Sequence, residues 1–204
     1  MTKENHSDIS DLLEFKLYEK TSPLWAQKVV ENFGDFLKDH AAAEKKAMST
    51  ALSMIAKYPN RVELVETMLH IAKEELEHYE QVTLLIHKRG EILKNDEKDT
   101  YIHELLALMR NGVQESFLDR LILGAIVENR GCERFAMVAQ ALPEGHELKD
   151  YYDHLSREEA KHYGQYIKLA RMYFNEKEIR ERLDFFLRAE SEIIRKLPIR
   201  AMLH

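Results

Sequence analysis

Apolar residues recur along most of the chain at steps of three and four, the spacing that places them on one face of an α-helix. Pro, Gly and Asn interrupt the pattern in short turns. Long helices are predicted over residues 23–57, 61–89, 114–142 and 147–173. Shorter helices are predicted over residues 8–20, 101–111 and 176–196. The pattern therefore indicates an all-α protein.

The connections between the long helices indicate how these helices are arranged. Short turns at 58–60 and 143–145 join the first two and the last two long helices, and a longer connection over 90–113 joins the pairs. Two short turns and one long crossover are typical of the ferritin-like four-helix bundle, here with additional short helices. No linker suggests a boundary, so residues 1–204 are predicted to form a single domain.

Polar residues interrupt the predicted apolar stripes at related positions. In two helices the interruption is a glutamate followed three residues later by a histidine, and residues at this spacing are neighbours that can share a metal ion. Each of the other two long helices carries one glutamate on its apolar face. The six candidate ligands are Glu44, Glu75, His78, Glu128, Glu159 and His162.

The charge of these ligands points to a pair of metal ions. Unpaired carboxylates in a bundle core would each cost several kcal/mol, so a positive group must accompany them. Two divalent irons supply about four positive charges against four carboxylates and two neutral imidazoles. One Glu from each of two helices with Glu-x-x-His from each of two others is the signature of di-iron and di-manganese bundles. The chain is therefore predicted to be one ferritin-like di-iron domain.

An internal repeat supports this choice of ligands. The segment AKEELEHYEQV, residues 72–82, matches SREEAKHYGQY, residues 156–166, at an offset of 84 residues. The same offset carries Glu44 onto Glu128, which indicates two similar helical hairpins. Glu133 is the alternative to Glu128, but its counterpart is Ser49, which is not an equivalent ligand.

Composition limits the setting of the protein. The net charge of −6 gives no general basic surface for nucleic acids, so a polyanionic partner would need a local patch. Cys132 is the single cysteine, which excludes an internal disulfide and favours a small buried thiol over a reactive one. Charges interrupt every apolar run and the first residues lack a secretory pattern, so a cytoplasmic protein without membrane segments is expected.

Other polar residues receive a structural interpretation. Six histidines lack a matching partner at ligand spacing, and surface or helix-end positions are expected for them. They are His40, His70, His87, His103, His146 and His154. Four cations follow the glutamates of the first and third long helices, and they form either a cationic rim for substrate or ordinary solvated faces. They are Lys45, Lys46, Arg130 and Arg134.

Two segments resemble a known family. DHAAAEKKAMSTALSMI around Glu44 and VENRGCERFAMVA around Glu128 resemble the tRNA 2-methylthio-N6-isopentenyladenosine hydroxylases, and the resemblance extends from SPLW near residue 22 to RLDFFLRAESEII near residue 194. It implies a non-haem di-iron monooxygenase that uses O2 to hydroxylate the isopentenyl group of a modified adenosine beside the tRNA anticodon. It also implies an external electron donor, and its metal ligands fall on the same six residues.

Other functions use the same pattern of ligands. An iron-storing or iron-oxidising ferritin relative, a rubrerythrin-like peroxidase, a di-manganese protein and a di-iron hydroxylase with another substrate remain open, because this ligand set does not discriminate among them. A helical interaction module without metal, whose buried carboxylates fix helix pairing, is a further alternative.

Overall fold

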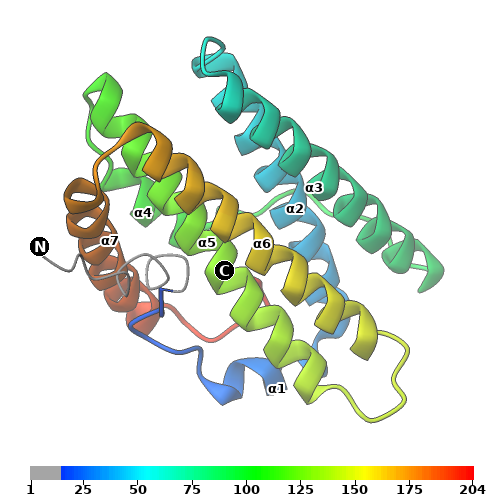
Figure 1. Cartoon of the computed structure of the whole chain (residues 1–204). Coiled ribbons are helices and arrows are strands. Elements are labelled where there is room, and N and C mark those ends of the chain that lie inside the picture. The colour runs from blue at the N-terminus through cyan, green and yellow to red at the C-terminus, as the bar shows by residue number, and fades with distance from the viewer. Residues whose placement is uncertain (1–14) are drawn as a thin grey trace, which may run out of the picture. The chain divides into compact units, whose positions relative to one another are not determined.

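The computed structural model describes residues 15–204, and within that range all regular secondary structure is helical (Figure 1). The helices are α1 (Pro23–Glu31), α2 (Phe33–Lys57), α3 (Val62–Lys88), α4 (Thr100–Ala107), α5 (Val113–Ala141), α6 (Lys149–Tyr173) and α7 (Glu176–Lys196). Most predicted boundaries agree with these to about two residues, as expected where helix ends fray.

The first long helix is an exception, because it is broken at Asn32. The backbone of Asn32 has φ −129° and ψ 45°, outside the helical region, and its side-chain amide donates to the carbonyl oxygen of Lys28 at 3.0 Å. The backbone N–H of Asn32 also donates to the Lys28 carbonyl at 3.2 Å, so the side chain adds a second hydrogen bond to this carbonyl at the end of α1. The predicted helix over 23–57 is therefore two helices, α1 and α2.

The predicted leading helix over 8–20 is wrong where it can be compared. Residues 8–14 lie outside the described range, and residues 15–20 are not helical. Side chains of α5 bind the backbone of this segment: Asn129 donates to the carbonyl of Phe15 at 3.0 Å, and Arg130 donates to that of Glu19 at 2.7 Å. In a helix over these residues, the same carbonyls would accept hydrogen bonds from backbone N–H groups of the helix itself.

The chain divides into two compact units. Unit 1 comprises the described part of residues 1–21 together with 101–135 and 153–197. Unit 2 comprises residues 22–100, 136–152 and 198–204. The division falls inside α5 and α6, so each of these continuous helices contributes residues to both units.

Unit 2 is built on the antiparallel pair of α2 and α3 (Figure 1). Tyr58 ends α2, and Gly90, with φ +74°, follows the end of α3 in the left-handed conformation that favours glycine. Buried apolar side chains line the facing sides of both helices, including Phe36, Leu37, Ala41, Leu64, Met68 and Ile71. An aromatic cluster around Phe36 extends this core to Trp25 and Tyr152.

Unit 1 contains buried ion pairs as well as an apolar core. Glu190 of α7 accepts hydrogen bonds from Arg130 of α5 at 2.7 and 2.8 Å and from Tyr101 of α4 at 3.2 Å. Asp119 of α5 accepts hydrogen bonds from Arg110 and from Arg182 of α7. These contacts fix α4 and α7 against α5.

None of the helices within residues 15–204 combines the length and apolar character needed to cross a membrane.

Candidate metal centre

Three of the predicted ligands lie together in unit 2. Glu44 projects from α2, and Glu75 and His78 project from one face of α3. Each offers a ligand atom, and these atoms all lie within 4.8 Å of one another. The Nδ1 atom of His78 is 3.4 Å from Oε2 of Glu75, as the three-residue spacing requires. All three side chains are buried. We call these residues the unit 2 triad.

The other three predicted ligands lie together in unit 1. Glu128 projects from α5, and Glu159 and His162 project from α6. Their ligand atoms also lie within 4.8 Å of one another, and Nδ1 of His162 is 3.2 Å from Oε2 of Glu159. Glu159 and His162 are 3% and 0% exposed, and Glu128 is 8% exposed. We call these residues the unit 1 triad.

The chemistry of each triad fits a metal ion. Carboxylate oxygens and imidazole nitrogens bind divalent transition metals at about 2.0–2.2 Å, so two ligands on opposite sides of one ion are about 4 Å apart. The triad atoms have a similar spread. Buried carboxylates are costly unless a cation accompanies them. The structure therefore contains buried Glu/His clusters that can hold metal.

His40, for which a surface or helix-end position was predicted, is buried and contacts the unit 2 triad. Nε2 of His40 is 2.6 Å from Oε1 of Glu44, and Nδ1 of His40 is 3.3 Å from the hydroxyl of Tyr152. Burial lowers the pKa of His40 to about 3, with a smaller contribution from His78, so the imidazole is neutral. Its position four residues before Glu44 on one helix face was the available signal.

The other five histidines for which surface or helix-end positions were predicted lie at exposed or half-exposed positions, as expected. His40 was the exception because it faces the core of unit 2, among Phe36 and Tyr152.

The position in α5 that corresponds to His40 is occupied differently. The 84-residue offset carries His40 onto Gly124. A Cβ atom on Gly124 would lie 2.5–2.7 Å from ring atoms of Tyr166, which leaves no room for a side chain. The two triads therefore share their ligand types but not their neighbours.

Comparison with known proteins shows the family to which the chain belongs. Residues 9–204 match the sequence model of the tRNA-(MS[2]IO[6]A)-hydroxylase (MiaE) family. The chain belongs to this family. The resemblance inferred from the segments around Glu44 and Glu128 is thereby confirmed.

Two relatives of this MiaE-family chain carry the same name, tRNA 2-(methylsulfanyl)-N(6)-isopentenyladenosine(37) hydroxylase. The protein from Pseudomonas putida is 38% identical over 174 residues, which cover 85% of this chain and 84% of the relative. The protein from Salmonella typhimurium is 32% identical over 160 residues, which cover 78% of this chain and 56% of the relative. The chain thus matches little more than half of the Salmonella protein's length.

A solved structure has a similar fold. It is described as protein 43 with aldehyde deformylating oxygenase activity from Synechococcus. It is 30% identical to this MiaE-family chain, with a TM-score of 0.87, and the match covers 94% of this chain and 96% of the other. The likeness confirms the predicted ferritin-like helical bundle.

Two further side chains near the unit 1 triad have other contacts. Glu133, the alternative to Glu128, pairs with Arg130 and accepts a hydrogen bond from the Thr21 hydroxyl at 2.7 Å. Sγ of Cys132 is 3.6 Å from the hydroxyl of Ser156, and burial raises the pKa of this thiol. A raised pKa disfavours the reactive thiolate.

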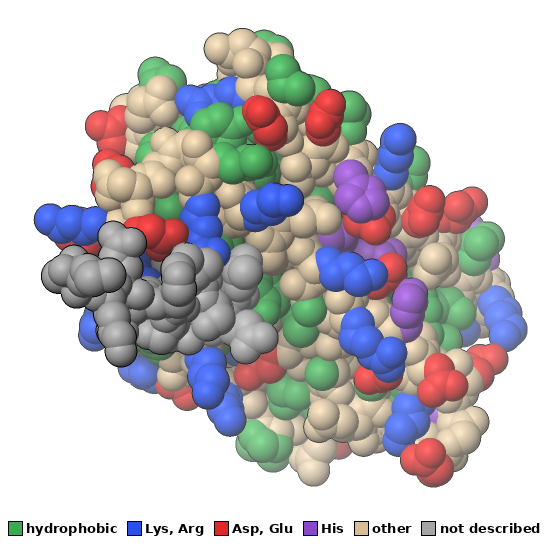
Figure 2. Space-filling view, viewed as in Figure 1, with side chains coloured by type: hydrophobic (Ala, Val, Ile, Leu, Met, Phe, Trp, Pro, Cys, Tyr) green, Lys and Arg blue, Asp and Glu red, His purple; other side chains and the backbone are tan. Residues whose placement is uncertain are grey.

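The four cations proposed as a substrate rim fall into two groups. Lys45 and Lys46 are partly exposed and lie 2.8 Å and 3.9 Å from the carboxylates of Asp96 and Asp99. Figure 2 shows basic and acidic side chains side by side on the face in view.

The rim prediction is wrong for the other two cations, Arg130 and Arg134, because both are buried in unit 1. Arg130 pairs with Glu190 of α7, and Arg134 lies near the Thr21 hydroxyl. Burial also lowers the pKa of Arg134 to about 10.

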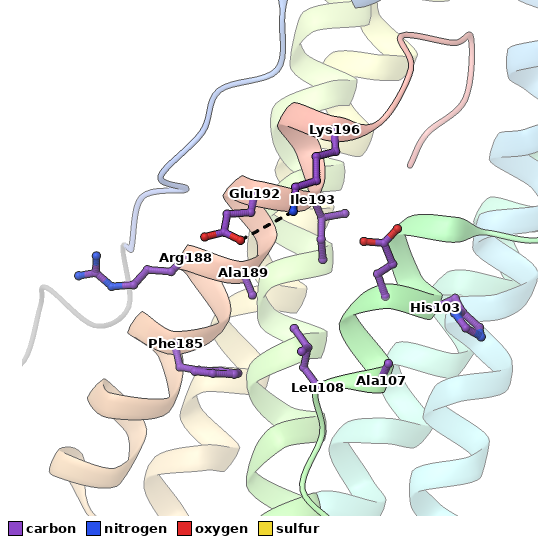
Figure 3. A pocket seen from close by; sticks show the side chains of 10 residues that line it. His103, Ala107, Leu108, Phe185, Arg188, Ala189, Glu192, Ile193 and Lys196 are labelled. Atoms are coloured by element: carbon purple, nitrogen blue, oxygen red, sulfur yellow. Dashed lines mark ion pairs between the residues drawn. The ribbon is translucent and has the colours of Figure 1, made fainter.

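A pocket of about 690 Å³ lies between α4 and α7 in unit 1 (Figure 3). Figure 3 shows Ala107, the last residue of α4, and Leu108, which follows α4, opposite Phe185 and Ile193 of α7. Its lining contains no triad residue and no residue proposed to contact substrate. Helical spacing does not predict this pocket, because its nearest lining residues from the two sides, Leu108 and Phe185, are 77 positions apart in the chain (185 − 108).

Proposed function

We propose that this chain is an O2-dependent, non-haem di-iron monooxygenase that hydroxylates the isopentenyl side chain of 2-methylthio-N6-isopentenyladenosine in tRNA. Membership of the MiaE family and 38% identity to a relative named for this reaction support the substrate. The observation that carries the proposal is the pair of buried Glu/His triads in a chain of this family.

Each triad is proposed to hold one of two iron ions. Four carboxylates and two neutral imidazoles balance the roughly four positive charges of two ferrous ions. The bound iron pair would supply the activation of O2 that attack on an unactivated carbon–hydrogen bond requires. The burial of these side chains would exclude water from a bound metal ion.

The remaining requirements of the reaction point to partners. A monooxygenase of this kind needs electrons from outside, and we propose that an electron-transfer protein supplies them. Lys45 and Lys46 are proposed to contact tRNA phosphates, since both ammonium groups are partly exposed. A tRNA substrate is consistent with a cytoplasmic location.

The test combines metal content with product analysis. The protein is loaded with Fe(II) without oxygen, then mixed with O2, a reductant and tRNA that carries the unhydroxylated nucleoside. Mass spectrometry of the digested tRNA should show a nucleoside heavier by one oxygen atom. Metal analysis should find about two irons per chain, as di-iron bundles hold.

Matched variants separate ligands from other glutamates. Glu75→Ala and Glu159→Ala should each lower the iron content and reduce hydroxylation to background. Glu74→Ala and Glu158→Ala remove the adjacent glutamates, which are outside the triads. These two variants should retain the iron content and the hydroxylation activity of the wild type. A wild-type protein that binds iron but leaves the nucleoside unchanged would refute the substrate, and one that binds no iron would refute the centre.

The likeness to the Synechococcus protein supports a second candidate, a di-iron oxygenase that acts on an aldehyde. Incubation of the iron-loaded protein with a long-chain aldehyde under the same conditions tests it. Conversion of the aldehyde without hydroxylation of tRNA would favour this candidate over the first.

A further inference from the structure

The contact between His40 and Glu44 links a candidate ligand to a buried chain of hydrogen bonds. His40 and Tyr152 are both fully buried, and the imidazole lies between the Tyr152 hydroxyl at 3.3 Å and the Glu44 carboxylate at 2.6 Å. We infer that His40 is a positioning residue, which holds the carboxylate of Glu44 in the orientation that binds metal. This inference rests on the proposed di-iron centre.

The chemistry of the groups fixes the direction of the hydrogen bonds. A metal-bound carboxylate only accepts hydrogen bonds, so Nε2 of His40 carries the hydrogen and donates it to Glu44. In the tautomer with this hydrogen on Nε2, Nδ1 accepts, and the Tyr152 hydroxyl donates to it. The hydrogen bond from His40 thereby holds the carboxylate of Glu44 in one orientation. Such contacts orient ligands and tune their affinity for metal.

Packing holds the imidazole ring in place. His40 stacks on Phe36 with ring centroids 6.0 Å apart and an interplanar angle of 29°. Tyr152 packs against His40 at 5.7 Å and against Phe36 at 5.8 Å. Phe33 contacts Tyr152 at 6.1 Å and Phe36 at 5.9 Å. The ring nitrogens are therefore directed by a rigid aromatic cluster.

Burial distinguishes this pair from similar pairs elsewhere. His70 and Glu74 in α3 have the same four-residue spacing, but the His70 side chain is 58% exposed and the two groups are 3.5 Å apart. An exposed pair of this kind contributes little, because water screens it and both side chains move. His40 and Glu44 are shielded from water, so their hydrogen bond is stronger and more directional.

The test measures metal binding directly. Co(II), a spectroscopic substitute for Fe(II), is titrated into metal-free protein while its visible absorption is recorded. His40→Phe keeps an aromatic ring but removes both nitrogens, and it should weaken one of two Co(II) ions about 10- to 100-fold. His40→Gln retains a side-chain N–H donor and should restore most of that affinity. His70→Phe is the matched control and should bind like wild type.

Each outcome has a distinct meaning. Unchanged Co(II) affinity in folded His40→Phe would overturn the positioning role while leaving the metal centre intact. Failure of the wild-type protein to bind Co(II) or Fe(II) would overturn the centre and this inference together. If His40→Phe does not fold, Tyr152→Phe provides the test: a several-fold loss of affinity for one Co(II) ion supports the chain of hydrogen bonds, and wild-type affinity contradicts it.

Discussion

The two triads have the same residue types at an offset of 84 residues, but their surroundings differ. In unit 2, His40 and Tyr152 place polar atoms beside Glu44. In unit 1, the corresponding position is Gly124, and the ring of Tyr166 fills the space. Metal chemistry allows few alternatives for a ligand, whereas a neighbour need only fit the packing of its own unit. The two halves of the repeat therefore share the residue types of their triads and differ in the side chains that surround them.

The units also differ in how they accommodate buried aspartates. Asp119 of unit 1 is hydrogen-bonded by Arg110 and Arg182; burial alone would raise its pKa, but these bonds lower it below its usual value. Asp39 of unit 2 has a pKa raised by burial, although the amide of Leu203 donates to it at 2.6 Å. Ionisation of Asp119 therefore stabilises the fold, and ionisation of Asp39 does not.

The largest effect should come from Asp119→Asn, which leaves two arginines without their carboxylate. We expect a loss of about 2–4 kcal/mol in the free energy of unfolding at pH 7. Asp39→Asn keeps an oxygen that accepts from Leu203 and should change stability by less than about 1 kcal/mol. Urea unfolding of both variants measures the difference.

The dependence on pH gives these variants a second test. Because the folded pKa of Asp119 is lowered, its contribution is present above the unfolded value, near 3.8, and is lost as pH falls through the folded pKa. The stability difference between wild type and Asp119→Asn should therefore shrink as acid is added below about pH 4. Equal differences at pH 7 and pH 3 would show that the charge of Asp119 is not responsible.

A smaller effect should follow from filling the space beside Gly124. Gly124→Ala places a methyl group against the Tyr166 ring and should cost about 1–3 kcal/mol. Gly164→Ala in α6 is the control, because its Cβ would meet nothing within 4 Å and alanine favours helix by about 0.5–1 kcal/mol. Thermal unfolding compares them.

A second substitution tests the cause of the Gly124→Ala effect. Tyr166→Val introduces the residue that unit 2 has at the corresponding position, Val82. In the Tyr166→Val background, Gly124→Ala should cost less than in wild type. If Gly124→Ala costs the same stability in both backgrounds, the Tyr166 ring is not the cause of the loss.

The smallest effect should come from the exposed cations of unit 2. Replacing Lys45 and Lys46 by Ala should weaken tRNA binding a few-fold and reduce the slope of log affinity against log salt by about 1 to 2, because each phosphate contact releases counterions. Lys28→Ala with Lys177→Ala is a control that removes the same charge from other exposed positions. The same change in slope for both double variants would indicate a general charge effect.

Helical period and its polar interruptions were sufficient to predict the long helices and to place a Glu-x-x-His motif on a buried side of α3 and of α6. Those features depend on spacing within one helix, which a sequence displays directly. The break at Asn32 was missed, because apolar spacing continues on both sides of it. The burial of Arg130 was also missed. Its partner Glu190 is 60 residues away in the chain, and helical spacing predicts contacts only between residues of one helix.

The pair formed by Arg130 and Glu190 constrains how this protein can change over generations. Loss of Arg130 alone leaves the buried carboxylate of Glu190 without its cation and costs about 3–5 kcal/mol, whereas joint replacement by apolar residues of similar volume is often neutral or better. A protein that exchanges the ion pair for two apolar residues one substitution at a time therefore passes through a single variant of low stability. Related lineages should therefore inherit both residues or neither, and a chain with only one of them should carry a compensating change beside Tyr101, the third member of the contact.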